Sequence, residues 1–219
     1  MFVSLGAIPG FASIIRFDFG GTIQTSDFGS VTVGTPFTGY LYYDTAAAPF
    51  FPATGPGFAV ANYIVPQAFL LNVGGSTVTA DPSSPLESAV RVIDRDASQP
   101  QPPGATDSIT FQLAGFKISG PLAGDVQTDH GLFLSFAGSP AVLDSVQLPG
   151  IFPDLGNWNN VLPDTSVGLV ANPKPDVFLS FNGQFSSVSS SAVPEPAYFL
   201  AAPLFLGAAG WVSRRKRFL

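Results

Sequence analysis

Alternation of apolar and polar residues is the feature that most restricts the fold of this chain. It recurs in short runs along most of the sequence, at residues 16–19, 31–33, 37–42, 90–92, 109–113 and 178–181. Because successive side chains of a strand point to opposite faces, this period of two predicts half-buried β-strands. No stretch before residue 197 keeps the 3.6-residue period of an amphipathic helix, so we expect only short helical turns, for example at 140–146.

Clusters of glycine and proline separate these runs, at residues 20–21, 34–36, 52–57, 74–75, 81–85 and 99–104. Such clusters favour turns, since glycine accepts a positive φ and proline fixes φ. Many short strands with turns between them predict an all-β domain over residues 13–185, an antiparallel β-sandwich of jelly-roll-like form. A domain boundary in the Pro-rich loop at 98–106 is the alternative, although each half then has few strands with which to close a sandwich.

Composition excludes several classes of protein. The chain is 46% hydrophobic and 11% charged, which is too apolar for a disordered protein. It has no cysteine, so it holds neither a disulfide framework nor a thiolate metal site. Its net charge of −6 repels phosphate, and we therefore expect no nucleic-acid partner.

The C-terminal end combines an uncharged run with a basic tail. Residues 197–213 carry no charge and as a helix would span about 25 Å, close to the roughly 30 Å of a bilayer core. Four basic residues follow: Arg214, Arg215, Lys216 and Arg217. The positive-inside rule keeps such a tail cytoplasmic, so the pattern predicts one C-terminal transmembrane helix with the lipid bilayer as its partner. The alternative is a buried core helix, which should show a polar face that this run lacks.

Directly before the apolar run stands Val193-Pro194-Glu195-Pro196, preceded by a Ser-rich stretch at 186–193 that we expect to be a linker. The order of a Pro-Glu-Pro motif, an apolar span and a basic end resembles the PEP-CTERM sorting signal of Gram-negative bacteria. The resemblance implies that Pro194, Glu195 and Pro196 are recognised by an exosortase-type processing protease. Residues 194–219 are then the signal, which holds the protein transiently in the inner membrane before release to the cell surface or extracellular matrix.

The N-terminal residues 1–12 are expected to be a truncated signal-peptide remnant. They are apolar but lack a basic region, and Gly10-Phe11-Ala12 fits a small-x-small cleavage site. The alternative is that residues 3–15 form a first strand. The segments at 17–23, 33–39, 42–45 and 69–75 also resemble cargo domains of PEP-CTERM proteins, which implies export and fold but no activity.

No catalytic constellation emerges from the residues. His130 is the only histidine, and a Ser-His-Asp triad built on it with Asp129 lacks a Gly-x-Ser-x-Gly elbow. Glu87 is the only glutamate outside the Pro-Glu-Pro motif and stands in a Ser/Pro-rich turn, which does not favour glycoside hydrolysis. The sequence therefore predicts a non-enzymatic protein without a cofactor.

With no cysteine and one histidine, the chain could bind a metal ion only through carboxylates, which suit calcium. Asp94 and Asp96 lie on one side of an extended segment, and calcium prefers hard oxygen ligands. However, no Asp-x-Asp-x-Asp-Gly loop is present. Pairing of these acids with Arg91 or Arg95 on a solvated edge is the alternative.

A sugar-binding surface is the second candidate site. Trp158 between Asn157 and Asn159, together with Tyr43 beside Tyr40 and Tyr42, offers rings that stack on pyranoses and amides that bind hydroxyls. A loop tryptophan can equally plug the end of a sandwich. The leading hypothesis is thus an exported structural protein of the surface or matrix, and the alternative is a carbohydrate-binding module recognising exopolysaccharide. Burial of Trp158 favours the first hypothesis, and exposure favours the second.

Overall fold

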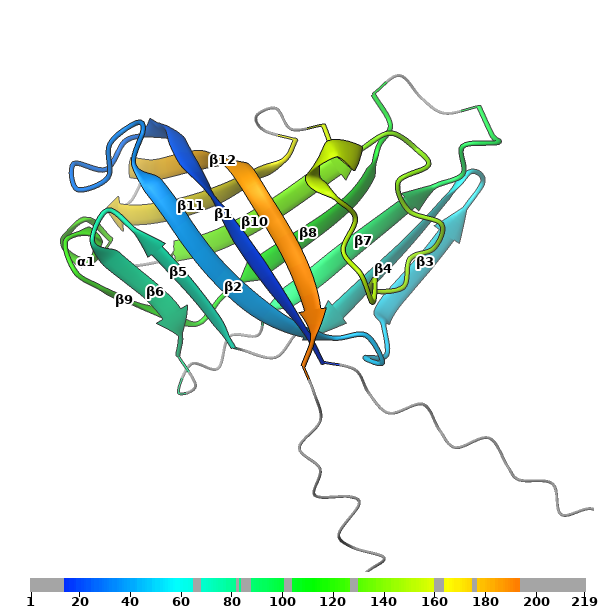
Figure 1. Cartoon of the computed structure of the whole chain (residues 1–219), viewed down its shortest axis with the longest axis horizontal. Coiled ribbons are helices and arrows are strands. Elements are labelled where there is room, and N and C mark those ends of the chain that lie inside the picture. The colour runs from blue at the N-terminus through cyan, green and yellow to red at the C-terminus, as the bar shows by residue number, and fades with distance from the viewer. Residues whose placement is uncertain are drawn as a thin grey trace, which may run out of the picture.

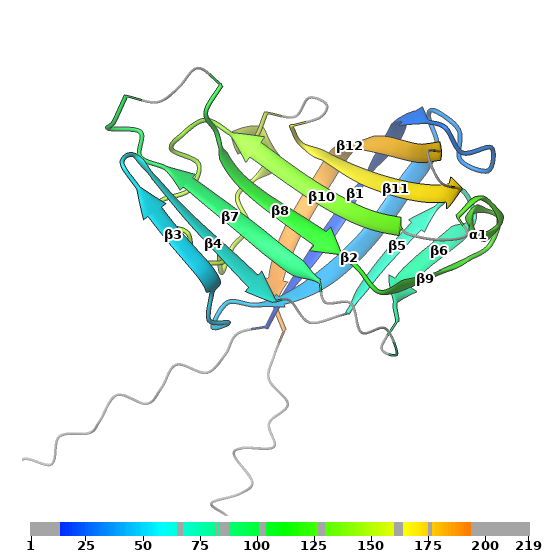
Figure 2. The ribbon, with the colours of Figure 1, turned by 180° about the vertical axis from the view of Figure 1, so that it is seen from behind.

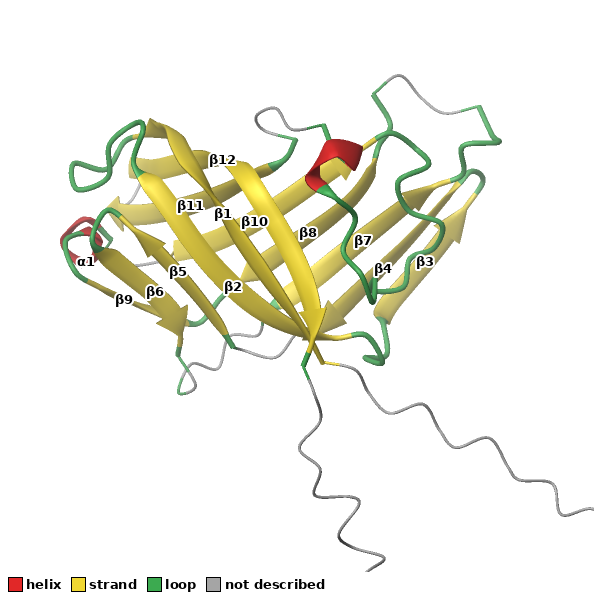
Figure 3. Cartoon of the chain, in the orientation of Figure 1, coloured by secondary structure: helices red, strands yellow, loops and turns green. Residues whose placement is uncertain are grey.

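The computed structural model describes residues 14–64, 68–81, 83, 88–100, 104–126, 130–159, 164–174 and 177–193. Strands dominate these residues (Figure 3). The strands are β1 Ile14–Ser26, β2 Pro36–Asp44, β3 Phe50–Gly55, β4 Phe58–Ile64, β5 Phe69–Val73, β6 Ser76–Ala80, β7 Ala89–Arg95, β8 Asp107–Leu113, β9 Phe116–Ser119, β10 His130–Gly138, β11 Ser166–Lys174 and β12 Val177–Ala192. The helical elements are α1 Leu122–Asp125 and the 3₁₀ turn η1 Leu155–Asn157.

All the described strands join one antiparallel sheet in the order β3-β4-β7-β8-β10-β11-β12-β1-β2-β5-β6-β9. The antiparallel all-β prediction is confirmed, while the described strands form one continuous sheet and not two separately hydrogen-bonded ones. The edge strands are β3 and β9. The Pro-rich loop at 98–106 joins two directly paired strands, β7 and β8, so it is not a domain boundary.

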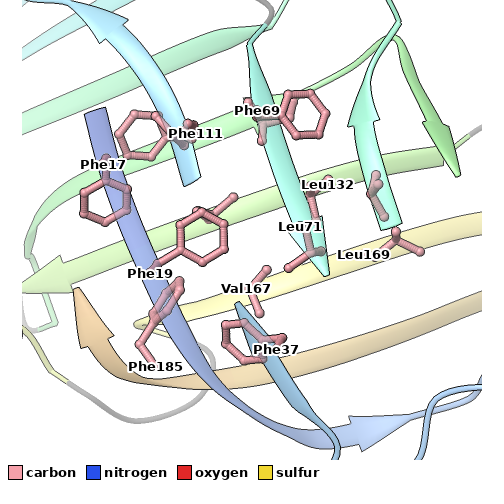
Figure 4. Packing of buried hydrophobic residues seen from close by; sticks show 14 of the residues in the cluster. Phe17, Phe19, Phe37, Phe69, Leu71, Phe111, Leu132, Val167, Leu169 and Phe185 are labelled. Atoms are coloured by element: carbon pink, nitrogen blue, oxygen red, sulfur yellow. The ribbon is translucent and has the colours of Figure 1, made fainter. Parts of the chain in front are cut away.

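The sheet bends back on itself (Figures 1 and 2), and the buried core between its two halves is rich in phenylalanine. Phe17 of β1 lies with its ring centroid 5.6 Å from that of Phe136 of β10 and 5.9 Å from that of Phe111 of β8. In the sheet, β11 and β12 separate β1 from β10. These contacts therefore cross the fold between its two halves, and Figure 4 shows Phe17 and Phe111 among the buried side chains.

Alternation along each strand decides which side chains enter this core. In β1, Ile15, Phe17 and Phe19 are buried while Arg16 and Asp18 between them are partly exposed. Each fully buried phenylalanine or isoleucine contributes about 1.5–3 kcal/mol relative to an exposed one. The strands predicted at 16–19, 37–42, 90–92, 109–113 and 178–181 all lie within observed strands.

A long connection after β10 covers part of the inner face. Asp107 at the start of β8 is fully buried, and its carboxylate accepts hydrogen bonds from the backbone N–H groups of Arg95, Ala141 and Leu143 at 2.7–3.0 Å. The Tyr63 hydroxyl of β4 donates to the Val146 carbonyl oxygen at 2.7 Å. This connection was expected to hold a helical turn at 140–146, but it consists of turns and bends, because side chains of the sheet hold its backbone groups.

Three further local predictions were wrong. Gly20 and Gly21, predicted to be a turn, lie inside β1 with a register shift between them, because β1 is paired on both sides. The run at 31–33 is a loop, and residues 52–55 belong to β3. In each case pairing with a distant strand, or its absence, overrides the local pattern.

The Ser-rich stretch predicted to be a linker is also strand. β12 continues to Ala192, and its serines pair with β1 in the register Ser187↔Gly20, Ser189↔Asp18 and Ser191↔Arg16. Serine is acceptable there because alternate positions face outward, where a small polar side chain costs little. The domain therefore extends past residue 185 to the end of β12.

No helix of sufficient length and apolarity to cross a bilayer occurs among the residues that the structure describes. The predicted signal-peptide remnant at 1–12 and the predicted sorting signal at 194–219 lie outside them.

Candidate functional site

The outward side chains of β12, β1 and β2 form a polar surface, which we call the outer face. It consists of Ser187, Ser189 and Ser191 from β12, Arg16, Asp18 and Gly20 from β1, and Thr38, Tyr40 and Tyr42 from β2. Register places these residues in cross-strand rows, such as Ser189, Asp18 and Tyr40. The strand period alone creates the surface, since the residues between them enter the core.

Arg16 is held in a fixed position at one end of the outer face. Its Nε and Nη2 donate to the Asp18 carboxylate at 2.8–3.0 Å, and its guanidinium carbon lies 4.4 Å from the centre of the Tyr40 ring. The hydrogen bond to Asp18 is the main cause that raises the pKa of Arg16. The Tyr42 ring meets the Tyr40 ring edge to face at 5.5 Å. These contacts give a neutral ion pair beside two partly exposed aromatic rings.

A groove of about 340 Å³ lies beside this cluster. Its lining residues are Asp18, Phe19, Gly20, Thr38, Gly39, Ser187, Val188 and Ser189. Gly20 keeps the groove open, because a Cβ added there would lie 3.1 Å from the Ser187 hydroxyl oxygen and 3.7 Å from the Thr38 methyl carbon. The floor is thus strand backbone, and hydroxyl groups line the sides.

A second hollow of about 510 Å³ adjoins the groove at Thr38, which lines both. It lies over β2, β5 and β6 and also contains Asn72 and Thr77, whose side chains are hydrogen-bonded to each other at 3.0 Å. Gly74 and Gly75 form the β5–β6 turn at its end with positive φ values of 56° and 74°, which glycine adopts without strain. The two hollows share Thr38 and together border five neighbouring strands, and we call the pair the hydroxyl channel.

The structure does not present the predicted sugar-stacking residues to a ligand. Trp158 is only 4% exposed, its ring contacts those of Phe136 and Phe152, and its Nε1 donates to the Pro153 carbonyl oxygen at 3.3 Å. Its backbone forms an isolated β-bridge with Gly138 at the end of β10, and this pairing holds the ring against the core. Its neighbours Asn157 and Asn159 are exposed, but they do not stand beside an exposed ring of Trp158.

Tyr43 is likewise a core residue. It is fully buried, and its hydroxyl donates to the Pro149 carbonyl oxygen at 2.7 Å. Burial raises its pKa well above the ordinary value for tyrosine. Tyr40 and Tyr42 have the opposite parity along β2 and point outward. Sequence reasoning named them but gave Tyr43 the binding role; the apolar Phe37 and Leu41, which share the parity of Tyr43, were the signal that identifies the inner face.

Asp94 and Asp96 line a separate hollow of about 220 Å³. Asp96 accepts hydrogen bonds from the backbone N–H and hydroxyl of Ser98, and these lower its pKa. Partial burial and the charges of Asp107, Asp144 and Asp96 raise the pKa of Asp94. No group of three or more histidine, cysteine, aspartate or glutamate residues suited to a metal ion occurs in the described part of the chain. Two carboxylates, one of them bound to its own turn, are short of the six to eight oxygen ligands that calcium takes.

The remaining sequence candidates are His130, Asp129 and Glu87. His130 begins β10, whereas Asp129 and Glu87 lie outside the described residues.

The two ends of the described chain lie side by side (Figure 1). Ile15 pairs with Ala192, and the Val193 backbone N–H donates to the Ile14 carbonyl oxygen at 2.8 Å. The expected sorting motif therefore begins at Pro194, one residue after the last described hydrogen bond of the sheet.

Comparisons with known proteins find no matching family model, no similar curated protein and no similar solved structure.

Proposed function

We propose that this chain is an exported, non-enzymatic protein of the cell surface or extracellular matrix of a Gram-negative bacterium, sorted through its C-terminal segment. The observation that carries the proposal is the order of Pro194-Glu195-Pro196, the uncharged run at 197–213 and the basic tail at 214–217. An exosortase-type protease and the inner-membrane bilayer are the partners that this order implies.

The end of the domain supports this proposal physically. β12 ends at Ala192, and proline can neither donate to a strand ladder nor continue a helix, so the motif favours extended backbone. A protease that cuts at or after Pro194 removes no residue from the described sheet. The released product would therefore keep its fold.

We further propose that the bent sheet serves as a jelly-roll-like sandwich, with the β12–β1–β2 part facing the β8–β10 part across the phenylalanine core. The ring contacts of Phe17 with Phe111 and Phe136 support this description. An aromatic core of this kind gives a matrix protein stability without cysteine.

Cell fractionation with a matched pair of variants tests the sorting proposal. In the first variant Pro194, Glu195 and Pro196 are all alanine, and in the second the basic tail is rewritten as Lys-Lys-Arg-Lys, which keeps every charge. We expect the first to accumulate in the inner membrane and the second to reach the surface and medium as the wild type does. Equal export of the triple-alanine variant would contradict the proposal.

A further inference from the structure

We propose that the hydroxyl channel on the outer face binds a neutral oligosaccharide chain. The inference deepens the proposed function, because it names the matrix component that the exported domain would hold. The site differs from the one expected around Trp158 and Tyr43, whose rings are buried.

The lining of the channel determines the chemical class of the ligand. Its described lining side chains include the hydroxyls of Ser187, Ser189, Thr38 and Thr77 and the amide of Asn72, which offer both donors and acceptors. Phe37 and Val73 also line the channel, and a sugar chain offers hydroxyls to the polar partners and apolar ring faces to these residues.

Charge argues for a neutral glycan over an anionic one. Asp18 is the only ionisable side chain among the described lining residues, and its carboxylate is already paired with Arg16 at 2.8 Å. No unpaired cation is therefore supplied to a carboxylate or sulfate group by these residues. The chain as a whole carries a net charge of −6, which further disfavours a polyanion.

The dimensions fit a chain of several sugars, not a single residue. The channel crosses β12, β1, β2, β5 and β6, and four strand spacings of about 4.8 Å give a length of about 19 Å. Tyr40 pairs with Asp18, which lines the groove, and Tyr42 pairs with Arg16, so their partly exposed rings stand next to the groove and offer aromatic surface to a pyranose at its edge. Gly20 has no side chain to fill the groove, where a Cβ would lie 3.1 Å from the Ser187 hydroxyl oxygen.

Thr38 is the position at which to test the channel, because it lines both hollows and is exposed. Thr38→Tyr fills the junction with a ring that β-strands accept well. Thr38→Val removes only the hydroxyl and keeps the shape. Gln112→Tyr is the matched control, since Gln112 is an exposed outward residue of β8, away from the channel.

The assay is isothermal titration calorimetry of the purified full-length chain in a detergent without sugar headgroups. The neutral probes are cellohexaose, maltohexaose and mannohexaose, and the anionic probe is hexagalacturonate. We expect binding of at least one neutral hexasaccharide, weakened about tenfold or more by Thr38→Tyr and about two- to tenfold by Thr38→Val. Gln112→Tyr should bind as the wild type does.

Absence of binding to all three neutral probes, stronger binding of hexagalacturonate, or wild-type affinity in both Thr38 variants would overturn the inference. Because the assay uses purified chain, its failure leaves the sorting proposal standing. Conversely, normal export of the variant in which Pro194, Glu195 and Pro196 are alanine would refute the sorting proposal and leave the binding result standing.

Discussion

Replacement of Asp107 by asparagine should destabilise the domain strongly without changing its surface. The side chain is fully buried, and its two oxygens accept three backbone N–H groups from β7 and the covering connection. Asparagine keeps one acceptor oxygen but turns an NH₂ group toward backbone donors. At least one backbone N–H then loses its acceptor and faces the NH₂ group of the asparagine, which is also a donor.

The structure gives the size of this effect. A hydrogen bond to a charged group is worth about 1.5–3 kcal/mol, and leaving a buried donor unsatisfied costs about 1–3 kcal/mol. Because Ala141 and Leu143 lie in a partly exposed connection that can take up water, we expect a net loss of about 2–4 kcal/mol for Asp107→Asn. For a domain of this size, that lowers Tm by about 5–15 °C.

Urea denaturation followed by tryptophan fluorescence measures the loss, since Trp158 is a buried residue of the same connection. Asp154→Asn is the control with the same change of charge, because Asp154 is exposed and its side chain caps no helix N–H. That variant should stay within about 0.5 kcal/mol of the wild type. If Asp107→Asn loses less than about 1 kcal/mol, or no more than the control, the structural role given to this carboxylate is wrong.

Three further predictions concern stability and pH. Gly21→Ala should cost about 1–3 kcal/mol or more in urea denaturation, because its Cβ would lie 2.0 Å from a backbone oxygen of β12, whereas Gly29→Ala has open space and should be nearly neutral. Burial raises the pKa of Tyr43, so its hydroxyl should resist ionisation in an ultraviolet titration until the protein unfolds. The stability of the fold should then decrease as the pH rises above about 10. Ionisation of Tyr43 together with the exposed tyrosines would contradict this. Asp94 and Asp96 should behave oppositely in thermal melts. The raised pKa of Asp94 means that stability is lost as the pH rises through its titration range, so Asp94→Asn should raise Tm at pH 7 and not at pH 3. The lowered pKa of Asp96 means that its charged form stabilises the fold, so Asp96→Asn should lower Tm at pH 7. Shifts of the same sign in the two variants at pH 7 would refute the assignment.

Strands with clear alternation were predictable because burial of one face requires apolar residues at every second position. Phe17 and Phe19 with Arg16 and Asp18 between them define β1 without any knowledge of its neighbours. The same holds for Ile109, Phe111 and Leu113 in β8.

Residues whose conformation depends on distant partners were not predictable. Gly20 and Gly21 resemble a turn in isolation, yet β12 and β2 pair with them on both sides. The serines of β12 resemble a linker, but β1 supplies the partner that makes them a strand. Pairing between the two ends of the chain leaves no local signal at either end.

Of the predicted sugar-binding residues, Trp158 and Tyr43 are buried, whereas Asn157 and Asn159 are exposed. The sequence indicates that tyrosines on β2 could meet a sugar, and parity separates Tyr43 from Tyr40 and Tyr42. Phe37 and Leu41 show which parity faces the core, because they are apolar and alternate in step with Tyr43. The channel itself could not be foreseen, because Ser187, Thr38 and Asn72 come together only through the register of strands remote in sequence.

We propose that this chain is exported and cut next to the end of its sheet. Intact-mass measurement of the protein purified from the cell surface and medium tests it most directly. We predict a product whose C-terminus lies at or shortly after Val193, with β12 complete and the basic tail at 214–217 absent. A surface-exposed or secreted product whose mass still includes residues 197–219 would contradict the claim.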